Sequence, residues 1–283
     1  MDNDNKKKIF HVRTIIMGIL LIVMIVSGIG VIRDRIESQR QREEQQRLAQ
    51  LASQTAAEVV VGSETEVEAE ETEAPYVSPI DFETLQAENS DVIGWIRIPD
   101  TKIDYPILHT DDNEKYLDTD FDGNKSVYGS IYLDCDSSPD FRGWNNPIYG
   151  HHMKDGSMFK DVVRFKDPEY FKEHQYFEIY TPDRTIHLKA VSCYYTGSNG
   201  IVRKTKFNSQ ESFDEWVMER LKPCKYAEIP EVQVGSMFVL VTCSYEMNDA
   251  RTLLYAVEVD EEGNVIPSDK ADYEPESSAG DGN

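Results

Sequence analysis

Two side chains near the C-terminus could together perform nucleophilic acyl chemistry. Cys243 ends the apolar run MFVLVTC, and Arg251 begins the run RTLLYAVEV after the segment SYEMNDA. If the two runs are neighbouring antiparallel strands, the thiol and the guanidinium stand side by side, because side chains alternate along a strand. A thiolate is a strong nucleophile, and a guanidinium beside it can stabilise an oxyanion. This segment alone leaves a buried structural cysteine beside a surface arginine as an open alternative.

A histidine is the third group that such chemistry needs, and His151 is the candidate. It follows the run NPIYG, where a glycine loosens the end of a predicted strand. His152 is its rival, with a purely structural histidine as the remaining alternative. Consecutive side chains on a strand point to opposite faces, so one of the two readily faces a shared site, and a joint metal site is awkward.

A cluster of aspartates offers a competing constellation. Asp118, Asp120 and Asp122, followed by Gly123, match the first half of a calcium-binding loop. The twelfth position of that loop would be Gly129 instead of a bidentate glutamate. A polar turn is therefore the favoured interpretation, and we expect neither a metal site nor a cofactor.

The cysteines and the overall charge exclude other classes of function. The four cysteines lie far apart and form no CxxC pair, so zinc-ribbon and thioredoxin-like sites have no support. They are Cys135, Cys193, Cys224 and Cys243. The net charge of −23 argues against a nucleic-acid partner, because phosphates would repel such a surface.

The elements that would position these residues are mostly strands. Eight short runs rich in Val, Ile, Tyr and Phe are separated by turn residues. They are VIGWIRI, YPILHT, GSIYLD, NPIYGH, YFEIYT, TIHLKAVSCYY, MFVLVTCSY and RTLLYAVEV. Such runs are typical of strands, and eight of them in one domain predict a mainly β fold with a closed or nearly closed barrel and few helices.

The sequence predicts both the start and the end of one helix. Phe213 to Leu221 carries its apolar side chains on one face, and Ser212 with Glu215 forms a plausible capping box. Pro223 would stop this helix, which sits inside a long connection between two strands.

The N-terminal part of the chain predicts a membrane anchor. Thr14 to Ile32 has no charged residue and spans roughly 28 Å as a helix, about the thickness of a bilayer core. A cleavable signal peptide is the alternative, but no cleavage site of small residues follows. Basic residues flank both ends of the span, and we expect the short N-terminal tail inside and the large acidic domain outside the membrane.

The chain therefore divides into five predicted segments. A stalk rich in Arg, Glu and Gln precedes a glutamate-rich linker that has too little apolar content to fold, and the C-terminal end has a similar composition. The segments are a cytoplasmic tail (1–13), a transmembrane anchor (14–32), a helical stalk and acidic linker (33–79), a catalytic domain (80–265) and a disordered acidic tail (266–283).

These motifs, taken in order, resemble a known family. The stretch GWIRIPDTKIDYPILHTDDNEKYL, then GSIYLD, then NPIYGHHMKDGSMF, then LVTCSYE with Arg251 is similar to the sortases, and specifically to class B. The connection containing SFDEWVMERLK resembles the helical insertion between the sixth and seventh strands that marks this class. Ser244 follows the cysteine where several relatives carry aspartate. The resemblance covers about residues 80–262.

The resemblance implies an eight-stranded sortase β-barrel and a cysteine transpeptidase. His151 would be the general acid and base, Cys243 the nucleophile, and Arg251 the group that stabilises the oxyanion and substrate. The implied partners are the C-terminal sorting motif of secreted proteins and an amine of a peptidoglycan precursor or a pilin. A cell-wall cysteine hydrolase and a catalytically silent surface binding module remain the alternatives.

Overall fold

The computed structural model describes residues 2–53, 76–197, 203–244, 246 and 249–270. The chain falls into two compact units, residues 1–46 and 47–283. Most of the predicted linker and most of the predicted acidic tail lie outside the described residues.

The N-terminal unit consists of most of one long helix, whose last residues belong to the second unit. Helix α1 (Asp2–Ser53) includes the apolar span and the predicted stalk. Its stretch Arg13–Ser53 is long enough and apolar enough over part of its length to cross a membrane once. An N-terminal signal sequence can meet the same criteria of helix length and hydropathy.

Eight strands close into a barrel, which confirms the predicted fold class. Their order around the barrel is β1-β2-β3-β4-β7-β8-β6-β5. Most neighbours are antiparallel, whereas β2 pairs with β3 and β4 pairs with β7 in parallel. The strands are β1 (Val92–Arg97), β2 (Asp104–Leu108), β3 (Tyr132–Leu133), β4 (Asn145–Tyr149), β5 (Tyr176–Tyr180), β6 (Thr185–Gly197), β7 (Met237–Cys243) and β8 (Ala250–Val259).

Side-chain alternation along β7 separates two of the three hydrophobic clusters of the core. Phe238 and Leu240 point into the barrel, whereas Val239 and Val241 pack with aromatic side chains on its outer face. Leu253 and Tyr255 of β8 belong to the same outer cluster. The outer faces of the two strands therefore coincide, as the sequence pattern predicts.

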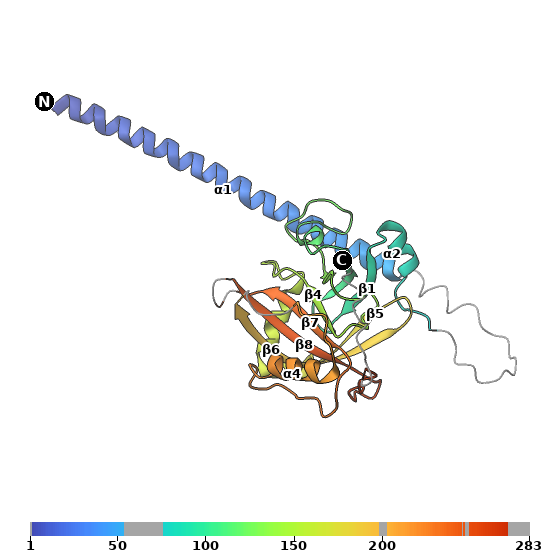
Figure 1. Ribbon diagram of the computed structural model, residues 1–283. Helices are drawn as coiled ribbons and strands as arrows, with labels where there is room; N and C mark the ends of the chain where they lie inside the picture. Colours follow the sequence, from blue (N-terminus) through green and yellow to red (C-terminus); the bar gives the residue numbers. More distant parts are fainter. Residues whose placement is uncertain (1, 54–75, 198–202, 245, 247–248, 271–283) are drawn as a thin grey trace, which may run out of the picture. The chain divides into compact units, whose positions relative to one another are not determined.

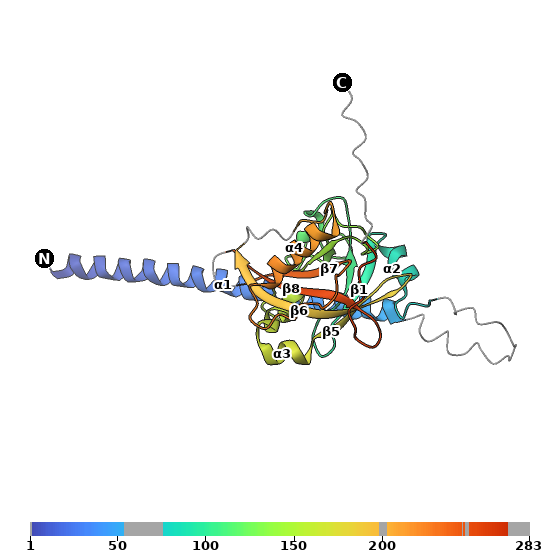
Figure 2. The same cartoon turned by 60° about the horizontal axis from the view of Figure 1, so that its bottom comes forward.

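Helix α4 (Gln210–Leu221) covers this outer face and lies close to β7 and β8 in both views (Figures 1 and 2). It begins earlier than expected, because the observed capping box joins Ser209 and Ser212 instead of Ser212 and Glu215. Each of the two serine hydroxyls accepts a hydrogen bond from the backbone N–H of the other serine, at 3.3 Å. The remaining helical elements are α2 (Phe82–Glu88), η3 (Lys115–Leu117), η4 (Phe159–Lys166) and α3 (Pro168–Glu173).

The folded unit extends beyond the expected boundaries at both ends. Leu48 and Ala52, which the sequence assigns to the stalk, are buried in one cluster with Phe82 and Leu85. At the other end, Ile266 N donates to a carbonyl of β8, so residues 266–270 pack on the barrel instead of starting a free tail. Each extension is only a few residues long, which is too short for composition to reveal.

Candidate active site

The register between β7 and β8 places Cys243 beside Arg251. The two residues are direct partners in the antiparallel ladder. Strand β8 begins at Ala250, one residue earlier than expected, and the Arg251 guanidinium donates to the Ala250 carbonyl at 3.1 Å. The thiol and the guanidinium thus share the outer face of the barrel at one end of both strands.

His151 reaches the same place through the other neighbour of β7. Tyr149 of β4 pairs in parallel with Val241, and Gly150 N donates to the Val241 carbonyl at 3.1 Å. His151 lies two residues after Tyr149, and Cys243 lies two residues after Val241. Both side chains are therefore on the same face of their strands. Gly150 is required between them, because a Cβ there would collide with Ile131 and Phe159 of the core.

His152 has a different position. Its Nδ1 donates to the backbone carbonyl of Cys243 at 2.9 Å, and its side chain is almost fully buried. Burial lowers its pKa, which keeps the ring neutral at physiological pH. The structure therefore brings His151 to the thiol and uses His152 to tie the strand ends together.

The His151 ring and the Cys243 thiol shift each other's pKa in opposite directions. A hydrogen bond with Cys243 is the largest influence that raises the pKa of His151, against the opposing effect of burial. The same bond lowers the pKa of Cys243, and the positive charge of Arg251 lowers it further. Both shifts favour a thiolate beside an imidazolium, which is the reactive form of a cysteine nucleophile.

The other cysteines lack this environment. Burial raises the pKa of Cys193 and of Cys135, and the charges of Asp134 and Asp136 add to the effect at Cys135. All four cysteines are free thiols. Cys243, in contrast, combines a lowered pKa with a position at a cavity.

A cavity of about 90 Å³ opens beside the three residues. His151, Cys243 and Arg251 line it together with two tyrosines, Tyr132 and Tyr149, whose ring centroids are 5.2 Å apart. Sequence reasoning did not single out the tyrosines. The available signal was spacing, because Tyr149 stands two residues before His151 and so shares its face.

A backbone carbonyl orients the imidazole. His151 Nε2 lies 2.7 Å from the carbonyl oxygen of Leu117, which can only accept, so Nε2 carries the proton. Nδ1 is then the ring nitrogen that can take up a proton without breaking this bond. The carbonyl thus takes the position that a carboxylate holds in a Ser-His-Asp triad.

Gly129 allows Leu117 to occupy this position. It has a φ of +54°, and a Cβ on it would lie 2.6 Å from the carbonyl oxygens of both Tyr116 and Leu117. The Leu117 carbonyl therefore packs directly against the backbone of Gly129. Any larger residue at position 129 must displace this carbonyl from its place beside His151.

We expect Gly129→Ala to slow alkylation of Cys243 by iodoacetamide at neutral pH by about fivefold, since one hydrogen bond is worth about 1 kcal/mol. Without the Leu117 acceptor, the imidazolium that supports the thiolate is less favourable. Gly123→Ala is the matched control, because Gly123 also has a positive φ, +81°, but nothing lies within 4 Å of its added Cβ. Equal alkylation rates in the two variants, measured by mass spectrometry of the Cys243 peptide, would remove the Leu117 carbonyl from the site.

The opposed pKa shifts predict the pH dependence of that alkylation. Because the pKa of Cys243 is lowered, its alkylation should reach half of its maximal rate below the ordinary cysteine pKa of about 8.5. The rate should fall as the pH drops through the shifted value and the thiolate is protonated. His151→Ala should move the midpoint upward, whereas His187→Ala, which removes a histidine paired with Glu178, should not. An unshifted midpoint in His151→Ala would show that the histidine does not activate the thiol.

Ser244, the residue that follows the cysteine, is buried and not exposed in the loop. Thr252 donates to its hydroxyl at 3.0 Å, and the hydroxyl also contacts Glu246. Glu246 in turn forms an ion pair with Lys166. The acidic group that contacts Ser244 is therefore Glu246, two residues further along the chain.

The predicted aspartate cluster forms a turn with separate partners. Asp120 accepts from the backbone N–H of Asn124 at 2.7 Å, and Asp118 forms an ion pair with Lys125 at 3.0 Å. Asp122 forms an ion pair with Arg47. Asp118 and Asp120 thus stabilise the turn itself, whereas Asp122 joins it to Arg47 of α1, and these contacts fit the polar-turn interpretation.

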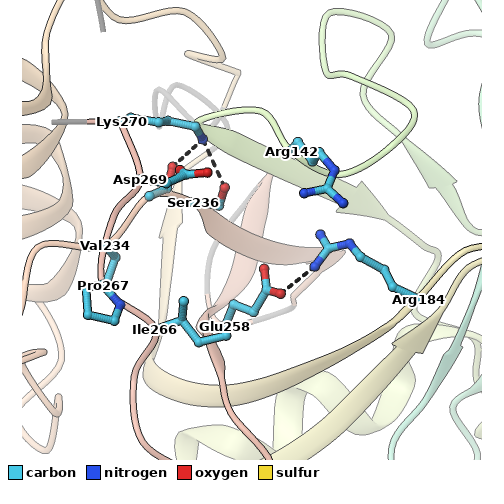
Figure 3. Close-up of a pocket in the computed structure, with 10 residues that line it drawn as sticks. Arg142, Arg184, Val234, Ser236, Glu258, Ile266, Pro267, Asp269 and Lys270 are labelled. Carbon is cyan, nitrogen blue, oxygen red and sulfur yellow. Dashed lines mark hydrogen bonds and ion pairs between the residues drawn. The ribbon is translucent and has the colours of Figure 1, made fainter. Parts of the chain in front are cut away.

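A larger cavity, of about 450 Å³, lies at the opposite end of β7 and β8 (Figure 3). It contains an ion pair between Arg184 and Glu258, and Lys270 donates to Ser236 at 3.2 Å. No cysteine or histidine lines it in the described part of the chain. The smaller cavity is therefore the one with reactive side chains.

Comparisons with known proteins agree with this geometry. The family model of the sortase domain matches residues 96–259. Sortase B of Listeria monocytogenes is 31% identical over 163 residues, which cover 57% of this chain and 66% of that protein, just under two thirds of its length.

Two crystal structures show the same fold. Clostridium perfringens sortase B is 27% identical with a TM-score of 0.60, and the match covers 63% of this chain and 99% of that one. A substrate complex of Staphylococcus aureus sortase B is 23% identical with a TM-score of 0.68, covering 80% of this chain and 99% of that one. The resemblance seen in the motifs is thereby confirmed: the chain belongs to the sortase family, in class B.

Proposed function

We propose that this chain is a membrane-anchored cysteine transpeptidase that joins a secreted protein to an amine at the cell surface. The observation that carries the proposal is the convergence of three strand ends, from β4, β7 and β8, on one cavity. They bring His151, Cys243 and Arg251 together, and the electrostatic coupling of the first two favours the thiolate.

In the first half of the reaction, the Cys243 thiolate attacks the carbonyl carbon of a peptide bond in the sorting motif. A C–S bond forms, and the carbonyl electron pair moves to oxygen, where the Arg251 guanidinium donates hydrogen bonds to the oxyanion. As the oxyanion collapses, the C–N bond breaks, and the His151 imidazolium gives its proton to the leaving amine. The products are a thioester on Cys243 and the released C-terminal peptide.

The second half resolves the thioester. A primary amine enters the cavity and attacks the thioester carbonyl, while neutral His151 accepts the proton that the amine loses. The C–S bond then breaks and restores the thiolate beside the imidazolium. The acyl acceptor in this proposal is an amine of a peptidoglycan precursor or of a pilin subunit, and the acyl donor is the sorting motif of a secreted protein.

The test is to incubate the full chain, in detergent, with a library of pentapeptides and to record the mass of the intact protein. We expect a thioester adduct on Cys243 that disappears faster when triglycine is added as an amine, with formation of the peptide–triglycine product. Release of free acid alone, whether or not triglycine is present, would indicate the hydrolase alternative. No adduct with any peptide would favour the silent binding module.

Membrane topology is the second part of the proposal. With helix α1 crossing once and the short basic tail inside, protease added to intact cells should digest the domain after Ile32 and leave the N-terminal tail protected. An epitope tag at each end, followed by immunoblotting, makes the measurement. Protection of the C-terminal tag while the cells remain intact would reverse the orientation.

A further inference from the structure

A buried carboxylate contacts Tyr149, one of the two tyrosines that form a wall of the cavity beside Cys243. Asp134, just after β3, has no exposed surface, and the Tyr149 hydroxyl donates to its Oδ2 at 2.7 Å. Burial, and then the negative charge of Asp134, raise the pKa of Tyr149 far above its usual range, so the phenol keeps its proton and its donor role. The position of the Tyr149 ring therefore depends on Asp134.

Arg203 supplies a cation to Asp134, whose carboxylate also accepts from the Asn113 side-chain amide at 3.2 Å and from the Asp136 backbone N–H at 3.1 Å. The Arg203 Nε donates to Asp134 Oδ2 at 2.9 Å, and its Nη2 donates to Asp136 at 3.1 Å. Oxygen and sulfur atoms of Asp134, Cys135 and Asp136 lie within 4.8 Å of one another, and the guanidinium supplies the positive charge among them. A fully buried carboxylate is costly unless a cation or several donors compensate its charge.

Arg203 comes from a distant part of the chain. It lies in the connection between β6 and β7, 69 residues beyond Asp134. The next residue, Lys204, is held as well, because its carbonyl accepts from the Asn145 amide at 3.1 Å, at the start of β4. The connection is thus joined to the strand that carries Tyr149 and leads into His151.

We propose that Arg203 is a positioning residue for the acyl-donor peptide: by compensating the buried Asp134 charge, it holds the Tyr149 ring as a wall of the cavity beside Cys243. The part of the inference that concerns the peptide rests on the proposed function. The side-chain hydrogen bonds of Arg203 go to Asp134, Cys135 and Asp136 and not to Cys243 or His151, so it acts on the shape of the cavity and leaves the reactivity of the thiol unchanged.

The experiment compares Arg203→Gln with Arg97→Gln in the full chain. Arg97 is a matched control, because its Nε donates to Asp104 at 3.0 Å and Asp104 also accepts from an aromatic side chain, Trp95. This second arrangement lies on β1 and β2, away from the cavity. For a peptide that the wild-type protein cleaves, we expect Arg203→Gln to raise KM about tenfold with kcat changed by less than about threefold, as loss of a charge-assisted hydrogen bond predicts.

Two further measurements separate positioning from general stability. The rate of Cys243 alkylation by iodoacetamide should stay within about twofold of wild type, since the small reagent does not need the wall. Arg203→Lys should recover part of the KM change, because it keeps the charge and loses the planar fork. An unchanged KM in a folded Arg203→Gln protein, or an equal change in Arg97→Gln, would overturn the inference.

Tyr149→Phe is a second variant that tests the inference if Arg203→Gln does not fold. It removes only the hydroxyl that contacts Asp134, and it should raise KM in the same direction. The double variant should show no larger rise than the stronger single variant, because both changes break the same chain of contacts. A normal KM in Tyr149→Phe contradicts the inference as well.

A readout without peptide keeps this inference distinct from the proposed function. Cys243 can be modified by methyl methanethiosulfonate and by the bulkier benzyl methanethiosulfonate, and the ratio of the two rates reports the shape of the cavity. Arg203→Gln or Tyr149→Phe should change this ratio, and Arg97→Gln should not. If the wild-type protein forms no thioester with any peptide, the proposed function fails, while the ratio still decides whether Arg203 shapes the cavity.

Discussion

Replacing Cys243 with alanine should abolish the thioester and lower the rate of peptide cleavage by at least about 10⁴-fold, as loss of a nucleophile does in other covalent hydrolases. His151 and Arg251 would remain, but neither can form the acyl intermediate. The measurements are kcat/KM for peptide cleavage and the intact mass after incubation with the peptide.

Cys193→Ala is the matched control for this variant. It also removes one sulfur atom, but from a fully buried thiol whose pKa is raised by burial and which donates to the Val162 carbonyl of η4. We expect a lower melting temperature, because a small core cavity costs stability. The value of kcat/KM should stay within about threefold of wild type, because the site remains in place. We also expect the thioester to form in Cys135→Ala and Cys224→Ala, because neither residue lines the cavity beside His151 and Arg251. A thioester that persists in Cys243→Ala, or vanishes in a folded Cys193→Ala protein, would show that another cysteine is the nucleophile.

The second large effect is expected for Arg251→Lys, which should lower kcat/KM by about 10² to 10³-fold, the usual cost of removing an oxyanion donor. Lysine keeps the positive charge but loses the planar fork that can donate two hydrogen bonds to one oxyanion. The melting temperature should change little, because a partly exposed ion at a strand end contributes less than about 1 kcal/mol to stability.

Arg184→Lys tests whether the loss is specific to the site. Arg184 is paired with Glu258 at the far end of the barrel, so its replacement should leave turnover near normal. Arg251→Ala should be at least as slow as Arg251→Lys. If the arginine variants retain nearly normal turnover, or if their loss of activity matches their unfolding at the assay temperature, Arg251 has no part in the transition state.

Side-chain alternation explains why the barrel and the pairing of Cys243 with Arg251 could be predicted from the sequence. Two neighbouring strands with a short connection have few possible registers once their apolar faces must coincide, and the observed register is one of these. The same rule distinguishes His151 from His152 only when it is known which face of β4 corresponds to the Cys243 face of β7. The structure supplies that face through the parallel pairing of Tyr149 with Val241.

Other parts of the site have no signature in the side-chain pattern. The Leu117 carbonyl is a backbone group, and only the collision at Gly129 reveals that its position is specified. The contact of Arg203 with Asp134 joins residues far apart in sequence, and charged residues of both signs are frequent throughout the chain. The start of α4 was wrong by three residues because Ser209 and Ser212 are both competent N-caps, and hydrogen bonding decides between them.

The parallel pairing of β4 with β7 also determines when during folding the thiol becomes reactive. His151 and Cys243 are separated by the whole of β5, β6 and α4, so they meet only after a long loop has closed, which is a late event in barrels of this kind. Until then, no imidazole lowers the pKa of Cys243, and its thiol has the modest nucleophilicity of an ordinary cysteine. We therefore expect Cys243 of a chain in which β4 and β7 are not yet paired to react more slowly with acyl donors and disulfides than Cys243 of the folded protein.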